Sequence, residues 1–340
     1  MQRSKIAFTV WLGLAVVLLS SPALAQYKLT NLVSNSSGTA KHTDPLLVNA
    51  WGLARSAGGP FWISDAGSGW STLYDGHGVK QGLQVLVPSE SGAGPGSPTG
   101  IVFNGSMGDF QVQGWQAFFL FATLDGTISG WAPQSNPNDA LIAVDNSASG
   151  TVYTGLAITS KPAGNFLYAA DNANNKVDVY DGSFNFVTSF TDSTLPAGFA
   201  AFGVQDIGGF VYVAFGKFGS PGGYIDIFQE DGTFVRQLAQ GKPLSNPWGF
   251  AVAPKNFGKL SNTLLVSNNT RNGTINAFNL ATGQFVGTVR DVNGKNIAID
   301  GLWGIEFGGG TANNGRTNQL FVTAGPNNYL AGTFGVIGLK

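Results

Sequence analysis

The chain has 340 residues, of which 49 are glycine, 15 are proline and none is cysteine, and only 11% are charged. Its 18 basic and 19 acidic residues nearly cancel, which excludes the basic surface of a nucleic-acid-binding protein and the charged heptads of a coiled coil. The lack of cysteine excludes disulfides, zinc–thiolate sites and a thiol nucleophile. Hydrophobic residues make up 43% of the chain, enough to form a large core.

Residues 1–25 have the three parts of a cleavable signal peptide. Arg3 and Lys5 carry positive charge, residues 6–19 are apolar, and Ala23-Leu24-Ala25 forms a small-residue cleavage motif. The apolar stretch is shorter than the roughly 20 residues of a membrane-spanning helix, so an uncleaved anchor is the weaker alternative. We therefore expect cleavage after Ala25, no membrane span in the mature chain, and a secreted or periplasmic protein.

A short motif recurs six times along residues 26–340. In each copy a bulky or polar residue precedes a glycine, and an apolar strand follows; the successive glycines are 48, 55, 48, 46 and 55 residues apart. A period of 20–50 residues is typical of solenoids and propellers. The six copies are Trp51-Gly52-Leu53, Thr99-Gly100-Ile101, Thr154-Gly155-Leu156, Phe202-Gly203-Val204, Trp248-Gly249-Phe250 and Trp303-Gly304-Ile305.

Each repeat contains further strand-like segments separated by Asx-Gly turns. Asp125-Gly126 and Asn272-Gly273, for example, suit a hairpin between the second and third strands, because both residue types tolerate positive φ. Fourth strands are predicted at residues 84–88, 141–145, 186–190, 234–238 and 285–289. No segment after the signal peptide shows helical periodicity.

The pattern predicts an all-β fold, a six-bladed β-propeller of four-stranded antiparallel blades. The sixth repeat ends after its third strand, residues 333–339, so we expect Tyr27–Ser34 at the mature N-terminus to supply the missing strand and close the ring. Another blade number or a β-solenoid is the alternative. Aromatic residues such as Trp62, Phe119 and Trp131 are predicted to pack in the core.

Two resemblances support this architecture. Residues 167–171 and 175–180 resemble an NHL-type propeller repeat, and the chain after residue 26 resembles a group of uncharacterised secreted bacterial propellers, some of which carry a PEP-CTERM sorting tail. The latter resemblance implies the fold and export but no activity. The sequence departs from that group at residues 267–273 and 327–329. Its matching stretches are residues 44–52, 195–199, 246–249, 300–304 and 321–325.

Candidate site residues follow from propeller geometry. The innermost strand of each blade starts on the face where the second strand ends, so side chains at those ends should ring the central opening. They are Asn49, Asp65, Asp125, Asp171, Asn246, Asn268 and Asp300. Carboxylate and amide oxygens suit Ca²⁺ or Mg²⁺, and gluconolactonase-type propellers, similar in fold, hold a divalent metal with such residues. Asp65, Asp171 and Asp300 are the candidate metal ligands, whereas turn capping is the structural alternative.

Catalytic signatures are few. There is no Gly-x-Ser-x-Gly elbow, HExxH motif or P-loop, and the two histidines, His42 and His77, are expected in exposed loops. The favoured function is therefore a monomeric, secreted binding or scaffolding protein whose polar funnel takes an extracellular small molecule, glycan, peptide or cell-envelope component. The alternatives are a metal-assisted hydrolase, lactonase or lyase and an electron-transfer enzyme with a quinone-type cofactor.

Overall fold

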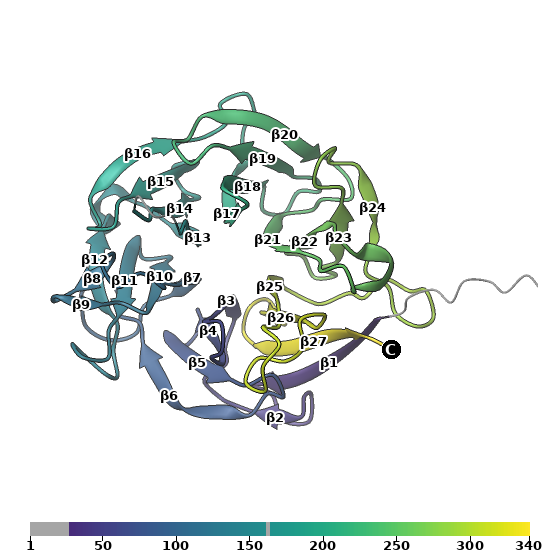
Figure 1. Ribbon diagram of the computed structural model, residues 1–340, viewed down its shortest axis with the longest axis horizontal. Coiled ribbons are helices and arrows are strands. Elements are labelled where there is room, and N and C mark those ends of the chain that lie inside the picture. Colours follow the sequence, from purple (N-terminus) through teal and green to yellow (C-terminus); the bar gives the residue numbers. More distant parts are fainter. Residues whose placement is uncertain (1–26, 161–163) are drawn as a thin grey trace, which may run out of the picture.

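The computed structural model describes residues 27–160 and 164–340, so the predicted signal peptide lies outside the described residues. The chain forms six four-stranded antiparallel blades arranged around a central axis (Figure 1). The 3₁₀ helices Ser147–Ser149 and Gly258–Leu260 are the helical elements of the described residues. In this part of the chain no helix is long and apolar enough to cross a membrane. The all-β six-bladed propeller predicted from the sequence is confirmed.

Each blade runs from an inner strand at the axis to an outer strand at the rim. Blade I is β3 (Ala50–Arg55), β4 (Phe61–Asp65), β5 (Trp70–Tyr74) and β6 (Lys80–Leu86). Blade II is β7 (Pro98–Phe103), β10 (Phe119–Thr123), β11 (Thr127–Trp131) and β12 (Leu141–Asp145). Blade III is β13 (Tyr153–Ile158), β14 (Leu167–Asp171), β15 (Lys176–Tyr180) and β16 (Phe186–Phe190).

The second half of the ring repeats this order. Blade IV is β17 (Ala200–Ile207), β18 (Phe210–Gly216), β19 (Tyr224–Phe228) and β20 (Phe234–Gln240). Blade V is β21 (Pro247–Val252), β22 (Leu264–Asn268), β23 (Ile275–Phe278) and β24 (Phe285–Thr288). Several strand ends differ from the sequence prediction, most of all at β6, which begins four residues before the predicted fourth strand at residue 84. Blade II also carries an additional hairpin, β8 (Gln111–Val112) and β9 (Trp115–Gln116).

Blade VI is built from both ends of the described chain. Its strands β25 (Leu302–Phe307), β26 (Leu320–Ala324) and β27 (Thr333–Leu339) are completed by β1 (Tyr27–Ser34), which pairs antiparallel with β27 from Tyr27↔Leu339 to Ser34↔Thr333. The short strand β2 (His42–Thr43) pairs in parallel with β1. The predicted closure of the ring by the N-terminal strand is confirmed, and it leaves β27 without an open edge.

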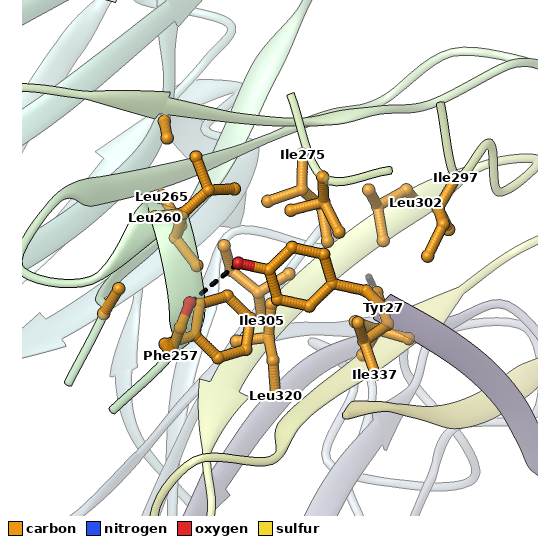
Figure 2. Packing of buried hydrophobic residues seen from close by; sticks show 14 residues of the cluster. Tyr27, Phe257, Leu260, Leu265, Ile275, Ile297, Leu302, Ile305, Leu320 and Ile337 are labelled. Atoms are coloured by element: carbon orange, nitrogen blue, oxygen red, sulfur yellow. Dashed lines mark hydrogen bonds between the residues drawn. The ribbon is translucent and has the colours of Figure 1, made fainter. Parts of the chain in front are cut away.

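Tyr27 anchors the closing strand to the neighbouring blade. Its ring lies among buried aliphatic side chains of blades V and VI, and its hydroxyl donates a hydrogen bond of 2.7 Å to the Phe257 carbonyl (Figure 2). Desolvation by burial raises the pKa of Tyr27 to about 12, so the hydroxyl keeps its proton. The first described residue of the chain is therefore part of the core.

The repeated glycines mark where neighbouring inner strands approach most closely. A Cβ on Gly52 would overlap the Thr99 carbonyl, and one on Gly203 would overlap the Trp248 carbonyl. At Gly304 it would lie 3.0 Å from the Trp51 carbonyl across the junction of blades VI and I. These three glycines have no positive φ, so the glycine is required by space rather than by backbone conformation. The glycine repeat in the sequence is therefore a consequence of the close packing of neighbouring inner strands around the axis.

Hydroxyl groups join adjacent blades at the same level. Ser267 Oγ accepts from the Gly249 N–H and donates to the Trp303 carbonyl at 2.7 Å. Thr323 Oγ1 repeats this geometry one blade later, accepting from the Gly304 N–H and donating to the Trp51 carbonyl at 2.5 Å. These bonds satisfy buried backbone groups of inner strands that have no further strand beside them.

The space between blades is filled by apolar side chains. Between blades I and II, Trp62 stacks on Phe119 with ring centroids 4.0 Å apart, and Trp131 lies 4.9 Å from Trp62. All three are buried, which confirms the prediction that these aromatic residues belong to the core.

An acidic pair interrupts the apolar packing between blades III and IV. Asp226 of β19 is completely buried, and Asp192 is close enough for its charge to act on it. Desolvation, reinforced by Asp192, raises the pKa of Asp226 to about 7. The folded protein therefore holds a proton on Asp226 at pH values where the unfolded chain has lost it.

This proton predicts a specific pH dependence of stability. Because the folded state binds more protons between about pH 4 and pH 7, the free energy of unfolding should fall as pH rises through that window. The Asp226→Asn variant lacks this titration, so at pH 8 it should be more stable than wild type by roughly 2 kcal/mol. The difference should disappear at pH 4. Urea denaturation at pH 4, 6 and 8 measures it, and equal pH profiles for both proteins would contradict the assignment.

Candidate functional site

The propeller has two faces, defined here by the ends of its inner strands. On the upper face these strands begin and the second strands end, as the pairs Ala50↔Asp65, Tyr153↔Asp171 and Pro247↔Asn268 show. On the lower face the inner strands end, at residues such as Arg55 and Phe307. The sequence prediction that these strand ends share one face is confirmed.

An aromatic cluster fills the axis below the upper face. It consists of the residues before the repeat glycines in four blades, Trp51, Phe202, Trp248 and Trp303, all buried. The Trp51 and Trp303 rings stack with centroids 3.5 Å apart, and Trp248 lies 5.9 Å from Trp303 at nearly a right angle. A small void of about 40 Å³ adjoins this cluster at the glycine level. The aromatic plug divides the axis into separate upper and lower parts.

Two of the predicted metal ligands are buried within their own blades. Asp65 accepts a hydrogen bond of 2.7 Å from Thr72 Oγ1, and burial raises the pKa of its carboxyl well above the usual value. Asp171 accepts from the Val152 N–H at 3.2 Å and from Asn174 Nδ2 at 2.7 Å. Both side chains are completely buried; Asp65 bonds the neighbouring strand β5, and Asp171 holds the turn between β14 and β15 through Asn174.

Three other candidates also hold the surrounding structure. Asn49 Oδ1 accepts from Trp303 Nε1 at 3.0 Å and so fixes the plug. Asn268 receives the Ser245 N–H at 3.0 Å, and Asp125 receives the Ser97 N–H at 2.8 Å. These contacts hold the three side chains against loops and the aromatic cluster at the upper face.

The fold brings the remaining two candidates, Asn246 and Asp300, into one cavity. This upper cavity has a volume of about 480 Å³ and lies over blades IV, V and VI. Its principal side chains are Phe218, Asn246, Asn269, Arg271, Asp300 and Tyr329. The size is that of a small-molecule site.

Hydrogen bonds fix several of the cavity side chains. Tyr329 donates to Asn269 Oδ1 at 2.8 Å, and its ring lies 5.5 Å from that of Trp303 in the plug. Arg271 Nη2 donates to Asn328 Oδ1 at 2.9 Å, and the Asn327 N–H donates to Asp300 Oδ2 at 2.9 Å. Burial raises the pKa of Tyr329, so its hydroxyl stays protonated.

Phe218 is a large apolar side chain of the upper cavity with 75% of its surface exposed. A large apolar ring left in water beside fixed amide, carboxylate and guanidinium groups gives the upper cavity both an apolar contact surface and polar partners. The sequence prediction did not include Phe218, Asn269, Arg271 or Tyr329. One feature of the sequence could have pointed to them. Residues 267–273 and 327–329 depart from the group of bacterial propellers that the chain resembles, and residues of both segments line this cavity.

The described residues contain no group of three or more His, Cys, Asp or Glu side chains arranged to hold a metal ion. His42 and His77 lie in exposed positions, as expected. The Ca²⁺ or Mg²⁺ site therefore stays a prediction, with Asp65, Asp171 and Asp300 as its proposed ligands.

A second cavity opens at the lower face and was not predicted. It has a volume of about 450 Å³, and the ends of five inner strands line it. Its charged members are Arg55, Asp206 and Glu306, and Arg55 Nε lies 3.2 Å from Glu306 Oε1. These residues were not predicted because the candidates were all placed on the face where the inner strands begin and the second strands end.

Solved structures of several proteins share this architecture. The chain is similar to a gluconolactonase from Xanthomonas campestris, with a TM-score of 0.57 and 15% identity over 94% of this chain and 92% of that one. It is also similar to a streptogramin B lyase, with a TM-score of 0.56 and 14% identity over 94% of this chain and 100% of that one. The expected likeness to gluconolactonase-type propellers is confirmed for the fold.

The sequence itself places the chain in a family of uncharacterised proteins. It is 32% identical over 337 residues to uncharacterized protein R648 of Acanthamoeba polyphaga mimivirus, covering 93% of this chain and 81% of that protein, and belongs to the same family. A second uncharacterised protein of this virus is 31% identical, covering 83% of this chain and 79% of its own length. No family model matches the sequence. These relatives give no support to the expected bacterial PEP-CTERM group.

Proposed function

We propose that the protein is an exported propeller that binds a glycan in the upper cavity. The observation that carries this proposal is the combination of an exposed aromatic ring, Phe218, with fixed amide, carboxylate and guanidinium groups around a cavity of about 480 Å³. A sugar ring offers an apolar C–H face and a rim of hydroxyl groups, and the cavity provides a partner for each.

The charges of the upper cavity favour a neutral ligand. Arg271 and Asp300 carry opposite charges, and the other polar side chains, Asn246 and Asn269 among them, are uncharged. Amides donate and accept hydrogen bonds, as hydroxyl groups do, so they match a polyhydroxylated ligand better than a phosphate or a polycation. Tyr329 and Asn269 already hold one another, and this reduces the loss of side-chain freedom on binding.

The test is binding to a panel of immobilised glycans, followed by calorimetry with the tightest binder. Phe218→Ala and Arg271→Ala should each weaken binding about tenfold, equivalent to about 1.4 kcal/mol. Both side chains are exposed, so stability should change little. The matched control is Phe186→Ala, which removes a 58% exposed ring from the outer strand β16.

Binding by wild type that both upper-cavity variants retain, or no binding to any glycan, would contradict the proposal. The same titration in EDTA separates the metal-assisted alternative. Glycan binding should persist in EDTA, whereas turnover of a lactone or ester that Ca²⁺ or Mg²⁺ restores would favour the hydrolase, lactonase or lyase.

A further inference from the structure

The lower cavity is a second, separate chamber on the propeller axis. The aromatic plug of Trp51, Phe202, Trp248 and Trp303 lies between it and the upper face. Its volume of about 450 Å³ falls in the range of small-molecule sites. Its lining combines polar groups at the strand ends with apolar side chains such as Phe250 and Val252, the latter 42% exposed. A ligand here would contact the ends of several blades at once.

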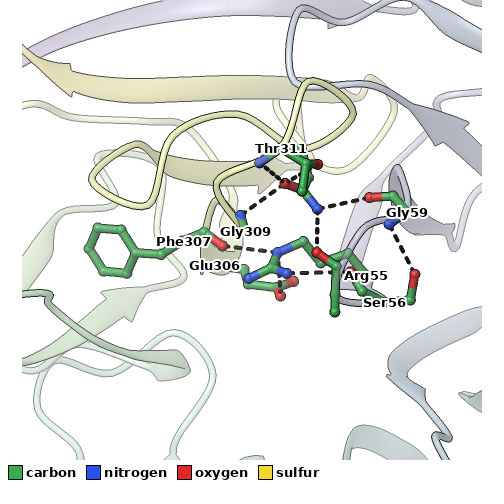
Figure 3. Close-up of polar contacts among 9 residues, drawn as sticks. Arg55, Ser56, Gly59, Glu306, Phe307, Gly309 and Thr311 are labelled. Carbon is green, nitrogen blue, oxygen red and sulfur yellow. Dashed lines mark hydrogen bonds and ion pairs between the residues drawn. The ribbon is translucent and has the colours of Figure 1, made fainter.

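The polar side of this chamber is held rigidly. Arg55 Nε donates to the Phe307 carbonyl at 3.1 Å and lies 3.2 Å from Glu306 Oε1 (Figure 3). Behind it, the buried Asn314 side chain donates to the carbonyls of Ala57 and Gly59, which joins the loop after β25 to the loop after β3. Arg55 and Glu306 are thus positioned before any ligand arrives.

Glu306 has one carboxylate oxygen in use and one to spare. Arg55 contacts Oε1, whereas the buried Oε2 has no hydrogen-bond partner among the described residues. An unpaired buried polar atom is costly, so a cationic ligand that takes the place of the carboxyl proton at this oxygen would gain more than one that pairs with a solvated carboxylate. The side chain is 29% exposed and lines the cavity.

The charge of the chamber decides what kind of donor fits. Arg55 contributes one positive charge, and Asp206 and Glu306 contribute two acidic groups; the remaining lining is uncharged. Once Glu306 has lost its proton, two acidic groups face one basic group and the lower cavity is net negative, with apolar side chains beside the charged ones. Such a site favours a cation with a hydrocarbon body over an anion.

We propose that the lower cavity binds a small amphipathic amine, with its ammonium group on Glu306 and its apolar body against Phe250 and Val252. This site is independent of the glycan site and uses different residues on the opposite face. It adds a second ligand class to the protein.

The site also predicts how binding changes with pH. Desolvation raises the pKa of Glu306 to about 8, although Arg55 acts in the opposite direction, so the empty chamber keeps a proton on this carboxyl near neutral pH. An ammonium ligand must displace that proton. Affinity should therefore rise as pH increases from 6 to 9, a range in which an alkylamine stays protonated.

The experiment uses 4-phenylbutylamine and its neutral counterpart 4-phenylbutanol, titrated into the full protein by calorimetry. The amine should bind at least tenfold more tightly than the alcohol at pH 9, and its affinity should fall at least tenfold between pH 9 and pH 6. Glu306→Gln should remove both the preference and the pH dependence. Asp300→Asn, at the upper cavity, should change neither.

A second variant tests the proposal even if Glu306→Gln does not fold. Val252→Trp would fill the lower cavity from an exposed position and leave Arg55 and Glu306 unchanged in the sequence. It should abolish amine binding. Equal affinities for amine and alcohol, unchanged amine binding in Val252→Trp, or its loss in Asp300→Asn would overturn the proposal. Failure of glycan binding alone would leave the amine result intact, so the two proposals are tested separately.

Discussion

Gly203→Ala should lose at least about 3 kcal/mol of folding free energy or fail to fold. The added Cβ would overlap the Trp248 carbonyl, a backbone atom of the next inner strand, so no side chain can turn aside to make room. Relief would require blades IV and V to separate at the axis, where Phe202 and Trp248 form part of the aromatic plug. Thermal and urea unfolding measure the loss.

Gly82→Ala is the matched control, because its added Cβ would have no heavy atom within 4 Å and its φ is not positive. That variant should be neutral or more stable by up to about 1 kcal/mol. Equal stabilities for Gly203→Ala and Gly82→Ala would show that the repeated glycine is not needed for the approach of neighbouring blades.

Removal of the closing strand should have an effect of similar size. A chain that starts after residue 35 loses β1, and with it the burial of Tyr27, Leu32 and Val33. At about 1.5–3 kcal/mol for each buried side chain, the loss is roughly 5 kcal/mol or more, and the melting temperature should fall by about 10 °C or more. The exposed edge of β27 should also promote aggregation.

The control for this deletion is a chain that starts at Gln26 and keeps β1 complete. It should melt cooperatively and remain monodisperse in size-exclusion chromatography. A shorter chain that is equally stable and equally monodisperse would show that the β1–β27 pairing does not hold the ring closed.

The fold was predictable because close packing of the inner strands requires a glycine in every blade, and these glycines form a sequence repeat. Gly52, Gly203 and their counterparts recur because neighbouring backbones approach too closely for a Cβ, and residues 27–34 could be matched to the strand missing from the last repeat. Strand ends were less predictable, as at β6, because outer strands are half-exposed and their pairing extends into turns.

The candidate site was only partly predictable. Strand order placed the Asx residues on one face, yet their side-chain directions depend on local bonds: Asp65 turns to Thr72, and Asn49 turns to Trp303. Only Asn246 and Asp300 reach the upper cavity. Glu306 of the lower cavity belongs to no sequence motif. Its ion pair with Arg55 forms only when the first and last blades come together.

Glycan binding in the upper cavity is tested most directly by a crystal structure of the full protein with the tightest-binding glycan. We expect sugar density in the upper cavity, with one ring against Phe218 and hydroxyl groups within hydrogen-bond distance of Asn246, Arg271 or Asp300. Sugar density at any other place on the propeller, with the upper cavity filled by water alone, would contradict it.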